Sequence, residues 1–274
     1  MNIVDVKSEL PTLLAPVSQA CTQAQFDEPS YEYWCQAIRE VPRYHRKQWE
    51  FCFILQALAV NDMLRPGARG LGFGVGREPL PALMASRGIS VLATDLETSS
   101  AVEAGWVSTL QHAPTREALN DRGICSPDEF SQLVDTRFMN MTAIDPNLDN
   151  FDFCWSACAL EHLGSIERGL TFIEQALSCL RPGGIAVHTT EYNCSSDEDT
   201  LDNSSTVLFR RRDIMGLAER LQGLGHSLVL NFTLGDGPVD RHVDVPPYSS
   251  DHHLKLLVGG FATTSFGLII RRAD

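Results

Sequence analysis

The sequence predicts an α/β fold: a Rossmann-like, mostly parallel sheet of seven strands with helices on both faces. The main observation is that short apolar segments alternate with helical patterns up to about residue 190, as parallel strands joined by crossover helices do. The composition agrees, because 274 residues with 43% hydrophobic and 21% charged side chains can bury one sizeable core. No run of 18 apolar residues occurs, so no transmembrane helix is expected.

Seven apolar segments are the expected strands, at 69–73, 90–94, 136–141, 151–155, 185–190, 227–234 and 263–270. Helical patterns between them lie at 78–87, 166–180 and 207–224. The loop before the last segment is rich in Pro, Asp and His and is too polar for a crossover helix. The last strand is therefore expected to run antiparallel, in a terminal hairpin with the strand before it.

Two helical patterns precede the first strand, between Tyr31 and Met63, with an interruption at Pro42. Residues 1–29 are irregular and contain three prolines, so they are expected to form a loosely attached arm. Residues 1–65 are thus interpreted as an N-terminal arm and helical cap, and residues 66–274 as the main domain.

The charge disfavours nucleic acid as a partner, because the net charge is −13 and a nucleic-acid binder needs a basic face. The basic runs at 45–47 and 210–212 fall in helical patterns and are interpreted as solvated helix faces. The eight cysteines include no CxxC pair, and the first residues lack the basic and apolar regions of a signal peptide. A cytoplasmic protein with no membrane partner is expected.

A glycine-rich turn at 70–76 separates the first predicted strand from the helix that follows it. Glycines allow positive φ and close approach of a ligand, and the helix start offers free N–H groups. Asp95 ends the next strand, where a carboxylate can accept both ribose hydroxyls of an adenosine. No frame of the turn gives G-x-G-x-x-G, and no Walker loop occurs, so a dinucleotide or a nucleoside triphosphate is disfavoured.

The turn Gly72-x-Gly74-x-Gly76 resembles motif I of the class I S-adenosylmethionine (SAM)-dependent methyltransferases, in particular of small-molecule and glycan O-methyltransferases. Asp95 matches their ribose-binding acid, and the segment 180–184 is similar to the turn before their fifth strand. The resemblance covers about residues 68–190 and implies that 66–274 is a methyltransferase domain with SAM as its cofactor. The cofactor contacts that it implies are Gly72, Gly74, Gly76, Glu78, Asp95, Leu96, Asn140, Met141 and Ser156.

Two positions depart from the family pattern. Gly70 stands where the family usually has an acid that contacts the methionine amino group, so Glu78 or a backbone carbonyl is expected to substitute. Asn140 stands near the position of the common adenine-contacting acid, and its side-chain carbonyl can accept from the adenine amino group.

Candidate catalytic residues follow the fourth and fifth predicted strands. Methyl transfer is an in-line displacement from the sulfonium, and a hydroxyl acceptor also has to lose its proton. His162, in a Leu-Glu-His segment similar to that of ubiquinone-type O-methyltransferases, is the first choice as general base; the alternative is that it caps the following helix. Glu161 lies beside it, and Glu191 is expected to contact substrate or a metal. His188 is interpreted as a core histidine, with catalysis as the alternative.

Glu161, His162 and Glu191, with His188 or His242 as a further ligand, offer oxygen and nitrogen atoms that suit Mg, Mn or Zn. The small-RNA 3′-end methyltransferases have a similar Glu-His cluster, but Cys158 stands here in place of their additional glutamate. A metal is therefore not favoured, and no metal ligand is predicted.

Two further segments are candidates for the acceptor side. Trp106, Gln111 and His112 either line the substrate mouth or pack within a helix, and packing is preferred for Trp106. The loop 240–248 mixes charge, His and aromatic residues and either closes over the acceptor or is a solvated loop.

The leading functional hypothesis is transfer of a methyl group to a hydroxyl of a small molecule, sugar or glycan. The alternatives are an N-methyltransferase of a small metabolite and a SAM-binding protein without catalysis.

Overall fold

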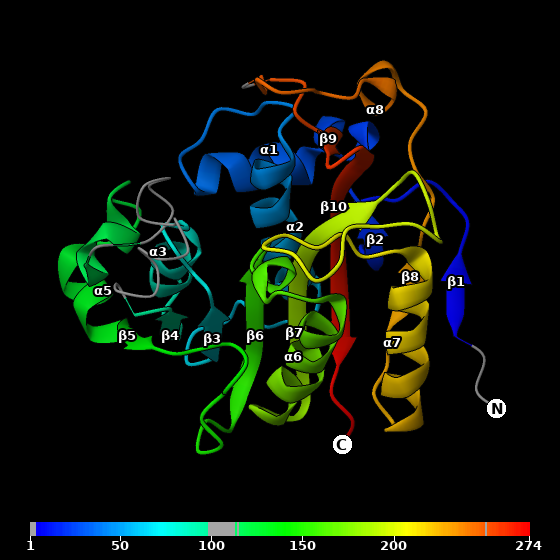
Figure 1. The fold of residues 1–274 in the computed structure, drawn as a ribbon. Helices are drawn as coiled ribbons and strands as arrows, with labels where there is room; N and C mark the ends of the chain where they lie inside the picture. Colours follow the sequence, from blue (N-terminus) through cyan, green and yellow to red (C-terminus); the bar gives the residue numbers. More distant parts are fainter. Residues whose placement is uncertain (1–3, 98–112, 114, 250) are drawn as a thin grey trace.

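The computed structural model describes residues 4–97, 113, 115–249 and 251–274. In the described part, ten strands form one sheet in the order β1-β8-β2-β10-β7-β6-β3-β4-β5, with β9 paired to β10 outside this path (Figure 1). The strands are β1 Asp5–Lys7, β2 Ser18–Ala20, β3 Arg69–Phe73, β4 Ser90–Asp95, β5 Val134–Phe138, β6 Phe151–Ala157, β7 Leu180–Asn193, β8 Val229–Asn231, β9 Leu256–Val258 and β10 Phe261–Arg271.

The central strands β5, β4, β3, β6 and β7 are parallel, and β10 runs antiparallel to β7. This confirms the predicted mostly parallel sheet with an antiparallel last strand. β7 starts five residues earlier than predicted, because 181–184, expected to be a turn, form an irregularity within the strand where its register against β6 shifts. β5 starts at Val134, two residues before its predicted segment.

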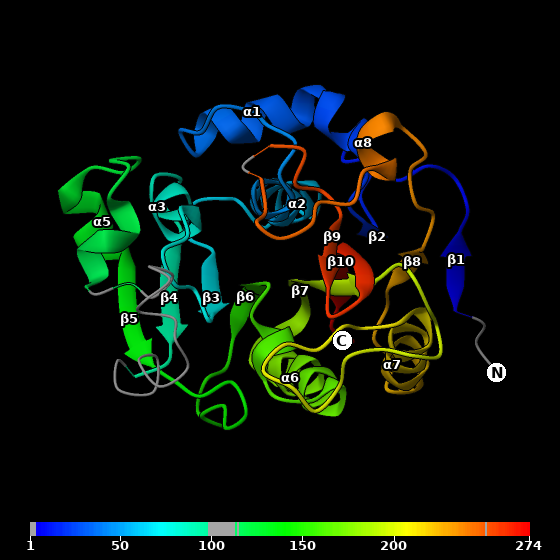
Figure 2. The same ribbon diagram turned by 45° about the horizontal axis from the view of Figure 1, so that its top comes forward.

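The helices are α1 Pro29–Ala37, α2 Arg46–Val60, α3 Leu80–Ala85, α5 Pro127–Leu133, α6 Ile166–Ser178, α7 Arg211–Gly223 and the short α8 Pro238–Arg241. Helices α2 and α3 cover one face of the sheet and α6 and α7 the other (Figure 2). Alternate residues of β6 divide between the two cores: Phe153 and Trp155 pack beneath α2, and Cys154 packs beneath α6.

The prediction of a loosely attached N-terminal arm is wrong. β2 is fully buried and is inserted between β10 and β8, antiparallel to the first and parallel to the second. Buried polar side chains hold it: Gln25 Oε1 accepts hydrogen bonds from Trp49 Nε1 at 2.7 Å and Gln19 Nε2 at 3.0 Å. This insertion separates β8 from β10, and the predicted hairpin of these two segments is reduced to one antiparallel bridge between Ser227 and Arg271.

Helix α2 packs against β6, β7 and β10, with Trp49 and Phe53 fully buried. Gly267 of β10 lies directly beneath Phe53, and a side chain at that position would collide with the Phe53 ring. The absence of a side chain there lets α2 lie close to the sheet, which brings its first turn to the carboxyl ends of β6 and β7. Within the described residues, no helix combines the length and the apolar character that crossing a membrane requires.

Candidate active site

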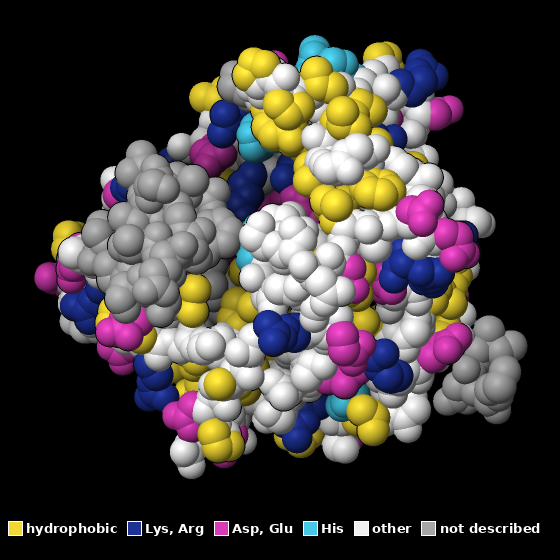
Figure 3. Space-filling view, in the orientation of Figure 1, with side chains coloured by type: hydrophobic (Ala, Val, Ile, Leu, Met, Phe, Trp, Pro, Cys, Tyr) yellow, Lys and Arg dark blue, Asp and Glu magenta, His cyan; other side chains and the backbone are white. Residues whose placement is uncertain are grey.

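A cavity of about 860 Å³ opens at the carboxyl ends of the parallel strands. The surface is hollowed there, and basic, acidic and histidine side chains are visible inside the hollow (Figure 3). The glycine turn and the end of β4 form one part of the wall, and the first turn of α2 and the end of β7 form another. The predicted residues that line it are Gly74, Gly76, Glu78, Asp95, Leu96, Asn140, Met141, Glu161, His162 and Glu191.

The glycine turn and Asp95 are joined by hydrogen bonds. Gly74 and Gly76 have φ values of +58° and +54°, a conformation that side-chain-bearing residues rarely adopt. A Cβ on Gly74 would also lie 2.8 Å from that of Ala159. The Asp95 carboxylate accepts from the backbone N–H of Gly76 at 3.1 Å and of Leu96 at 2.8 Å, which fixes the turn against the end of β4.

Asn140 and Met141 line the same part of the cavity after β5. The Asn140 Oδ1 atom accepts hydrogen bonds from the backbone N–H of Thr142 at 2.9 Å and from its hydroxyl at 2.8 Å. The carbonyl that was expected to receive the adenine amino group therefore already has two donors, and the Asn140 side chain shapes the loop. Met141 is buried, and its sulfur lies close to Gly74.

Two predicted cofactor residues do not line the cavity. Gly72 lies within β3, where a Cβ would collide with the Trp155 ring, so this glycine makes room for the core. Ser156 points to the opposite face of the sheet from Trp155, because neighbouring strand residues alternate between faces. There its hydroxyl is hydrogen-bonded to His188 Nδ1 at 2.8 Å. Ala157, Cys158 and Ala159 line the cavity instead.

His188 is a core residue, as its preferred interpretation predicted. It is fully buried, its ring packs edge-on against Phe172, and burial lowers its pKa to about 3, so the imidazole is neutral. His188 and Ser156 therefore form a polar pair inside the core beneath α6.

Glu78 is buried beside the glycine turn. One carboxylate oxygen accepts from Trp155 Nε1 at 3.0 Å, and the other has no hydrogen-bond partner among the described residues. Burial raises the pKa of Glu78 to about 8, against the opposing effects of Lys47 and of the Trp155 hydrogen bond. Such an acid is poised to ionise when a cation binds next to it.

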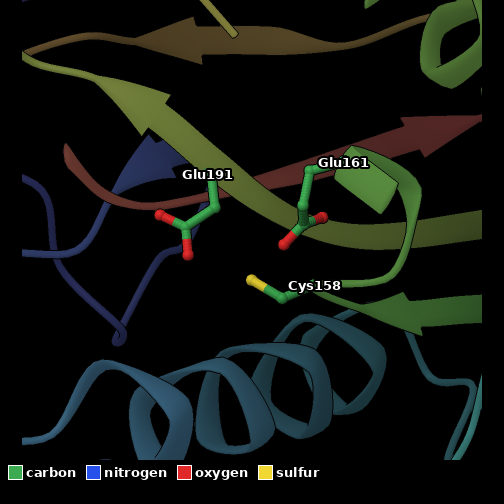
Figure 4. Close-up of side chains that lie close together, drawn as sticks. All are labelled: Cys158, Glu161 and Glu191. Atoms are coloured by element: carbon green, nitrogen blue, oxygen red, sulfur yellow. The ribbon is translucent and has the colours of Figure 1, made fainter. Parts of the chain in front are cut away.

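Three side chains meet after β6 and β7: Cys158, Glu161 and Glu191 (Figure 4). One ligand atom of each lies within 4.8 Å of the others. Glu161 belongs to the 3₁₀ turn η3, Leu160–His162, and is fully buried. Burial, followed by the negative charge of Glu191, raises the pKa of Glu161 to about 8. The histidines considered with the disfavoured metal alternative, His162, His188 and His242, are not members of this three-residue group.

Two basic residues of the run 45–47 were wrongly interpreted as a solvated helix face. Arg46 forms an ion pair with Glu191, and its side chain is only 17% exposed. Lys47 forms an ion pair with Glu50 at 3.1 Å and donates to the carbonyl of Ala157 at 2.8 Å, while its side chain faces the cavity. Helical periodicity alone could not show that this first turn of α2 meets the ends of β6 and β7.

Glu50 and Cys158 complete the site; Glu50 was not singled out from the sequence, and Cys158 was noted only as the replacement of a glutamate. Burial opposes ionisation of Glu50, but Lys47, Arg46 and hydrogen bonds outweigh it, so the pKa of Glu50 lies below its usual value. The Cys158 thiol donates to Glu50 Oε1 at 3.0 Å. Burial and the nearby charges of Glu161 and Glu50 raise the pKa of the Cys158 thiol well above its usual value, so the thiol keeps its proton.

His162 lines the cavity at the edge of this group. Its Nδ1 atom lies 2.9 Å from the carbonyl oxygen of Ser205, an arrangement in which Nδ1 carries a proton and donates. Burial lowers the pKa of His162, although the Ser205 carbonyl opposes this effect. The imidazole is thus neutral near pH 7 and held in one orientation.

Of the two segments predicted for the acceptor side, one lies outside the described residues and the other lies at the cavity mouth. Trp106, Gln111 and His112 lie outside the described residues. The loop 240–248 is tied to the cavity mouth through Asp244, which is buried and hydrogen-bonded to His253 Nδ1 at 2.7 Å. His253 lines the cavity and stacks on His45.

No protein-family model and no curated protein matches the sequence, but solved structures do. TehB from Haemophilus influenzae has a TM-score of 0.50 and 13% identity, covering 89% of this chain and 67% of that one. A putative sarcosine dimethylglycine methyltransferase from Galdieria sulphuraria has a TM-score of 0.48 and 12% identity, over 90% and 99% of the two chains. The CcbJ methyltransferase from Streptomyces caelestis has a TM-score of 0.44 and 14% identity, covering 80% of this chain and 93% of that one. The predicted fold is confirmed: the chain has the fold of the class I SAM-dependent methyltransferases.

Proposed function

We propose that this protein is a SAM-dependent methyltransferase that acts on a small-molecule acceptor. The observation that carries the proposal is the continuity of one cavity. It connects the Gly74–Gly76 turn and Asp95, a site suited to an adenosine, with the buried acids Glu161 and Glu191, a site suited to a polar acceptor. A cofactor bound at one end would present its methyl group toward the other.

In this proposal the Asp95 carboxylate receives the ribose hydroxyls, since a carboxylate can accept several hydrogen bonds. Glu78 receives the ammonium group of the methionine part, because its second oxygen lacks a partner among the described residues. Lys47 holds the methionine carboxylate, because its ammonium has three N–H groups and faces the cavity. When bound, SAM supplies an electrophilic methyl group on a positively charged sulfur.

The acceptor end provides two candidates for taking a proton. Glu161 has a pKa of about 8 and lies in the buried group with Glu191. His162, the choice made from the sequence, lies at the edge, with one ring nitrogen committed to Ser205. A base with a pKa near the working pH is the more effective one, which favours Glu161. A hydroxyl of a small molecule or glycan, and an amine, are both nucleophiles that such a carboxylate can orient.

Calorimetric titration of the protein with SAM, S-adenosylhomocysteine (SAH) and NAD tests the proposal. SAM and SAH are expected to bind with one site each, and NAD is expected to give no heat of binding, since the turn has no site for a pyrophosphate. Tighter binding of NAD would overturn the proposal. Binding of SAM without transfer of a labelled methyl group to any amine or alcohol would indicate the non-catalytic alternative.

A further inference from the structure

The lining of the cavity contains more buried acids than unpaired bases. Four buried glutamates line the cavity, namely Glu50, Glu78, Glu161 and Glu191. The two cations of α2 are already paired, Arg46 with Glu191 and Lys47 with Glu50. The two other arginines that line the cavity are exposed and are bonded to Asp121 and to the Leu163 carbonyl. Burial lowers the pKa of His45 to about 4, so it adds no charge near neutral pH.

Glu161 is the acid that this arrangement leaves without a strong donor. Its Oε2 atom accepts only a long hydrogen bond from the Thr190 hydroxyl, at 3.3 Å, and its Oε1 atom has no partner among the described residues. The carboxylate points toward Cys158 and Glu191 (Figure 4). An unmade hydrogen bond on a fully buried carboxylate is costly, so a ligand that donates N–H or O–H groups here would be stabilised.

We propose that the acceptor is a primary or secondary amine whose nitrogen binds between Glu161 and Glu191, and that Glu161 takes its proton. This inference rests on the proposed function and specifies its substrate class. Arg46 neutralises Glu191, so ionisation of Glu161 adds one negative charge that no cation pairs with, and a bound ammonium neutralises that charge. An ammonium also has enough N–H groups to serve both acids, whereas a hydroxyl has one.

The proton balance favours an amine over a hydroxyl for the same reason. Once ionised, a carboxylate whose acid has a pKa of about 8 can take a proton from an alkylammonium at modest cost. It is far too weak a base to generate an alkoxide. Glu191, held in its ion pair with Arg46, keeps a remaining N–H group in place, so that the nitrogen lone pair is directed at the methyl carbon.

The reaction then balances in two steps. The bound ammonium transfers one proton to the Glu161 carboxylate and becomes a neutral amine. The nitrogen lone pair forms the new N–C bond to the methyl group while the C–S bond breaks and its electron pair stays on sulfur. The products are an N-methylated ammonium and neutral thioether SAH, and the proton on Glu161 leaves to solvent when the product departs.

A metal ion is the competing occupant, because Cys158, Glu161 and Glu191 offer three ligand atoms. Two features disfavour it. The Cys158 thiol is used as a donor to Glu50, and a metal would have to remove its proton. The guanidinium of Arg46 already occupies one side of Glu191. An ammonium displaces neither group.

The test uses the protein saturated with SAH and two small probes, ethylamine and ethanol, which differ in the donor group and are too small to be excluded by shape. Binding is followed by the NMR shifts of the backbone amides of Cys158, Glu161 and Glu191. Ethylamine is expected to saturate these shifts with an affinity at least about ten-fold higher than ethanol, a difference of about 1.4 kcal/mol. Ethylamine is also expected to be converted to N-methylethylamine when SAM replaces SAH.

Glu161→Gln, which keeps the shape of the side chain, is expected to lose the preference for ethylamine while it still binds SAH. Glu198→Gln, at a residue whose side chain is 82% exposed, is the matched control and is expected to keep it. Equal binding of ethanol, or an unchanged preference in Glu161→Gln, would overturn the amine. Stoichiometric binding of Zn²⁺ that depends on Cys158 and prevents ethylamine from binding would also overturn the amine proposal. Failure of SAH itself to bind would instead refute the proposed function.

Discussion

Arg46 and Glu191 form an ion pair at the upper edge of the sheet, between the first residue of α2 and the end of β7. The Glu191 side chain is 6% exposed, and its other oxygen accepts from the Thr263 hydroxyl of β10 at 2.8 Å. Buried charges are tolerated when they are paired and hydrogen-bonded, so this contact fixes α2 and the acid at the cavity with respect to each other.

Removal of the cation should be strongly destabilising. Arg46→Ala leaves Glu191 buried without its partner, and breaking a buried pair in this way costs about 3–5 kcal/mol of unfolding free energy. Urea denaturation measures the loss. Arg43→Ala is the control, because Arg43 is 46% exposed and lies 3.9 Å from Glu40; a surface pair of this kind contributes about 0–1 kcal/mol. Equal losses in the two variants would contradict the stabilising role of the buried pair.

The sequence was sufficient for the parallel half of the sheet, because apolar strands, glycine turns and helical periodicity all agree between residues 69 and 190. It was not sufficient for β2. That strand is made of Ser18, Gln19 and Ala20. Its polar side chains are satisfied by hydrogen bonds, Ser18 to the distant carbonyl of Ile269 and Gln19 to nearby Gln25, so its burial leaves no apolar signal. Pairing with distant residues also explains why the terminal hairpin was predicted wrongly.

The sequence likewise predicted some residues of the candidate site and missed others. The position of Asp95, Glu161 and Glu191 at one cavity could be predicted, because strand ends converge at one edge of a parallel sheet whatever the details of packing. Arg46 and Lys47 could not, because their role depends on where α2 lies on the sheet. The position of Gly72 against Trp155 could not be predicted either, since a motif does not show which of its glycines faces a cavity and which faces the core.

Asp95 is expected to control cofactor affinity. Asp95→Ala removes the proposed ribose acceptor and also the two hydrogen bonds that hold Gly76 and Leu96, so SAM should bind at least about ten-fold more weakly. Calorimetry with SAM measures the change. Asp149→Ala, at an exposed position outside the cavity, is expected to bind SAM like the wild type. Unchanged affinity in Asp95→Ala would rule out the ribose contact.

Glu78 should make the ligand-free protein less stable as the pH rises. Its pKa is about 8 in the folded protein and 4.5 ordinarily, so the folded state binds more protons between these values. Stability therefore falls as the pH rises through this window. Between about pH 7 and 8.5, above the range in which histidines titrate, the unfolding free energy of Glu78→Gln should therefore fall by about 1–2 kcal/mol less than that of the wild type. Denaturation at the two pH values measures it, and parallel curves for both proteins would contradict the raised pKa.

The pH dependence of methyl transfer distinguishes Glu161 from His162 as the base. Activity requires the base to be unprotonated, so kcat/KM for ethylamine should rise with pH until the controlling group has ionised. The pKa of Glu161 is about 8, whereas burial places that of His162 below 6.5, and an alkylammonium ionises well above both. With Glu161 as base, the rise is centred near pH 8 and disappears in Glu161→Gln, while His162→Gln retains it. A rise centred below 6.5 that survives in Glu161→Gln and is lost in His162→Gln would assign the proton transfer to the histidine. SAH binding is measured on the same variants as a control. If a variant loses the rise of kcat/KM with pH but binds SAH with unchanged affinity, the substituted residue is the base.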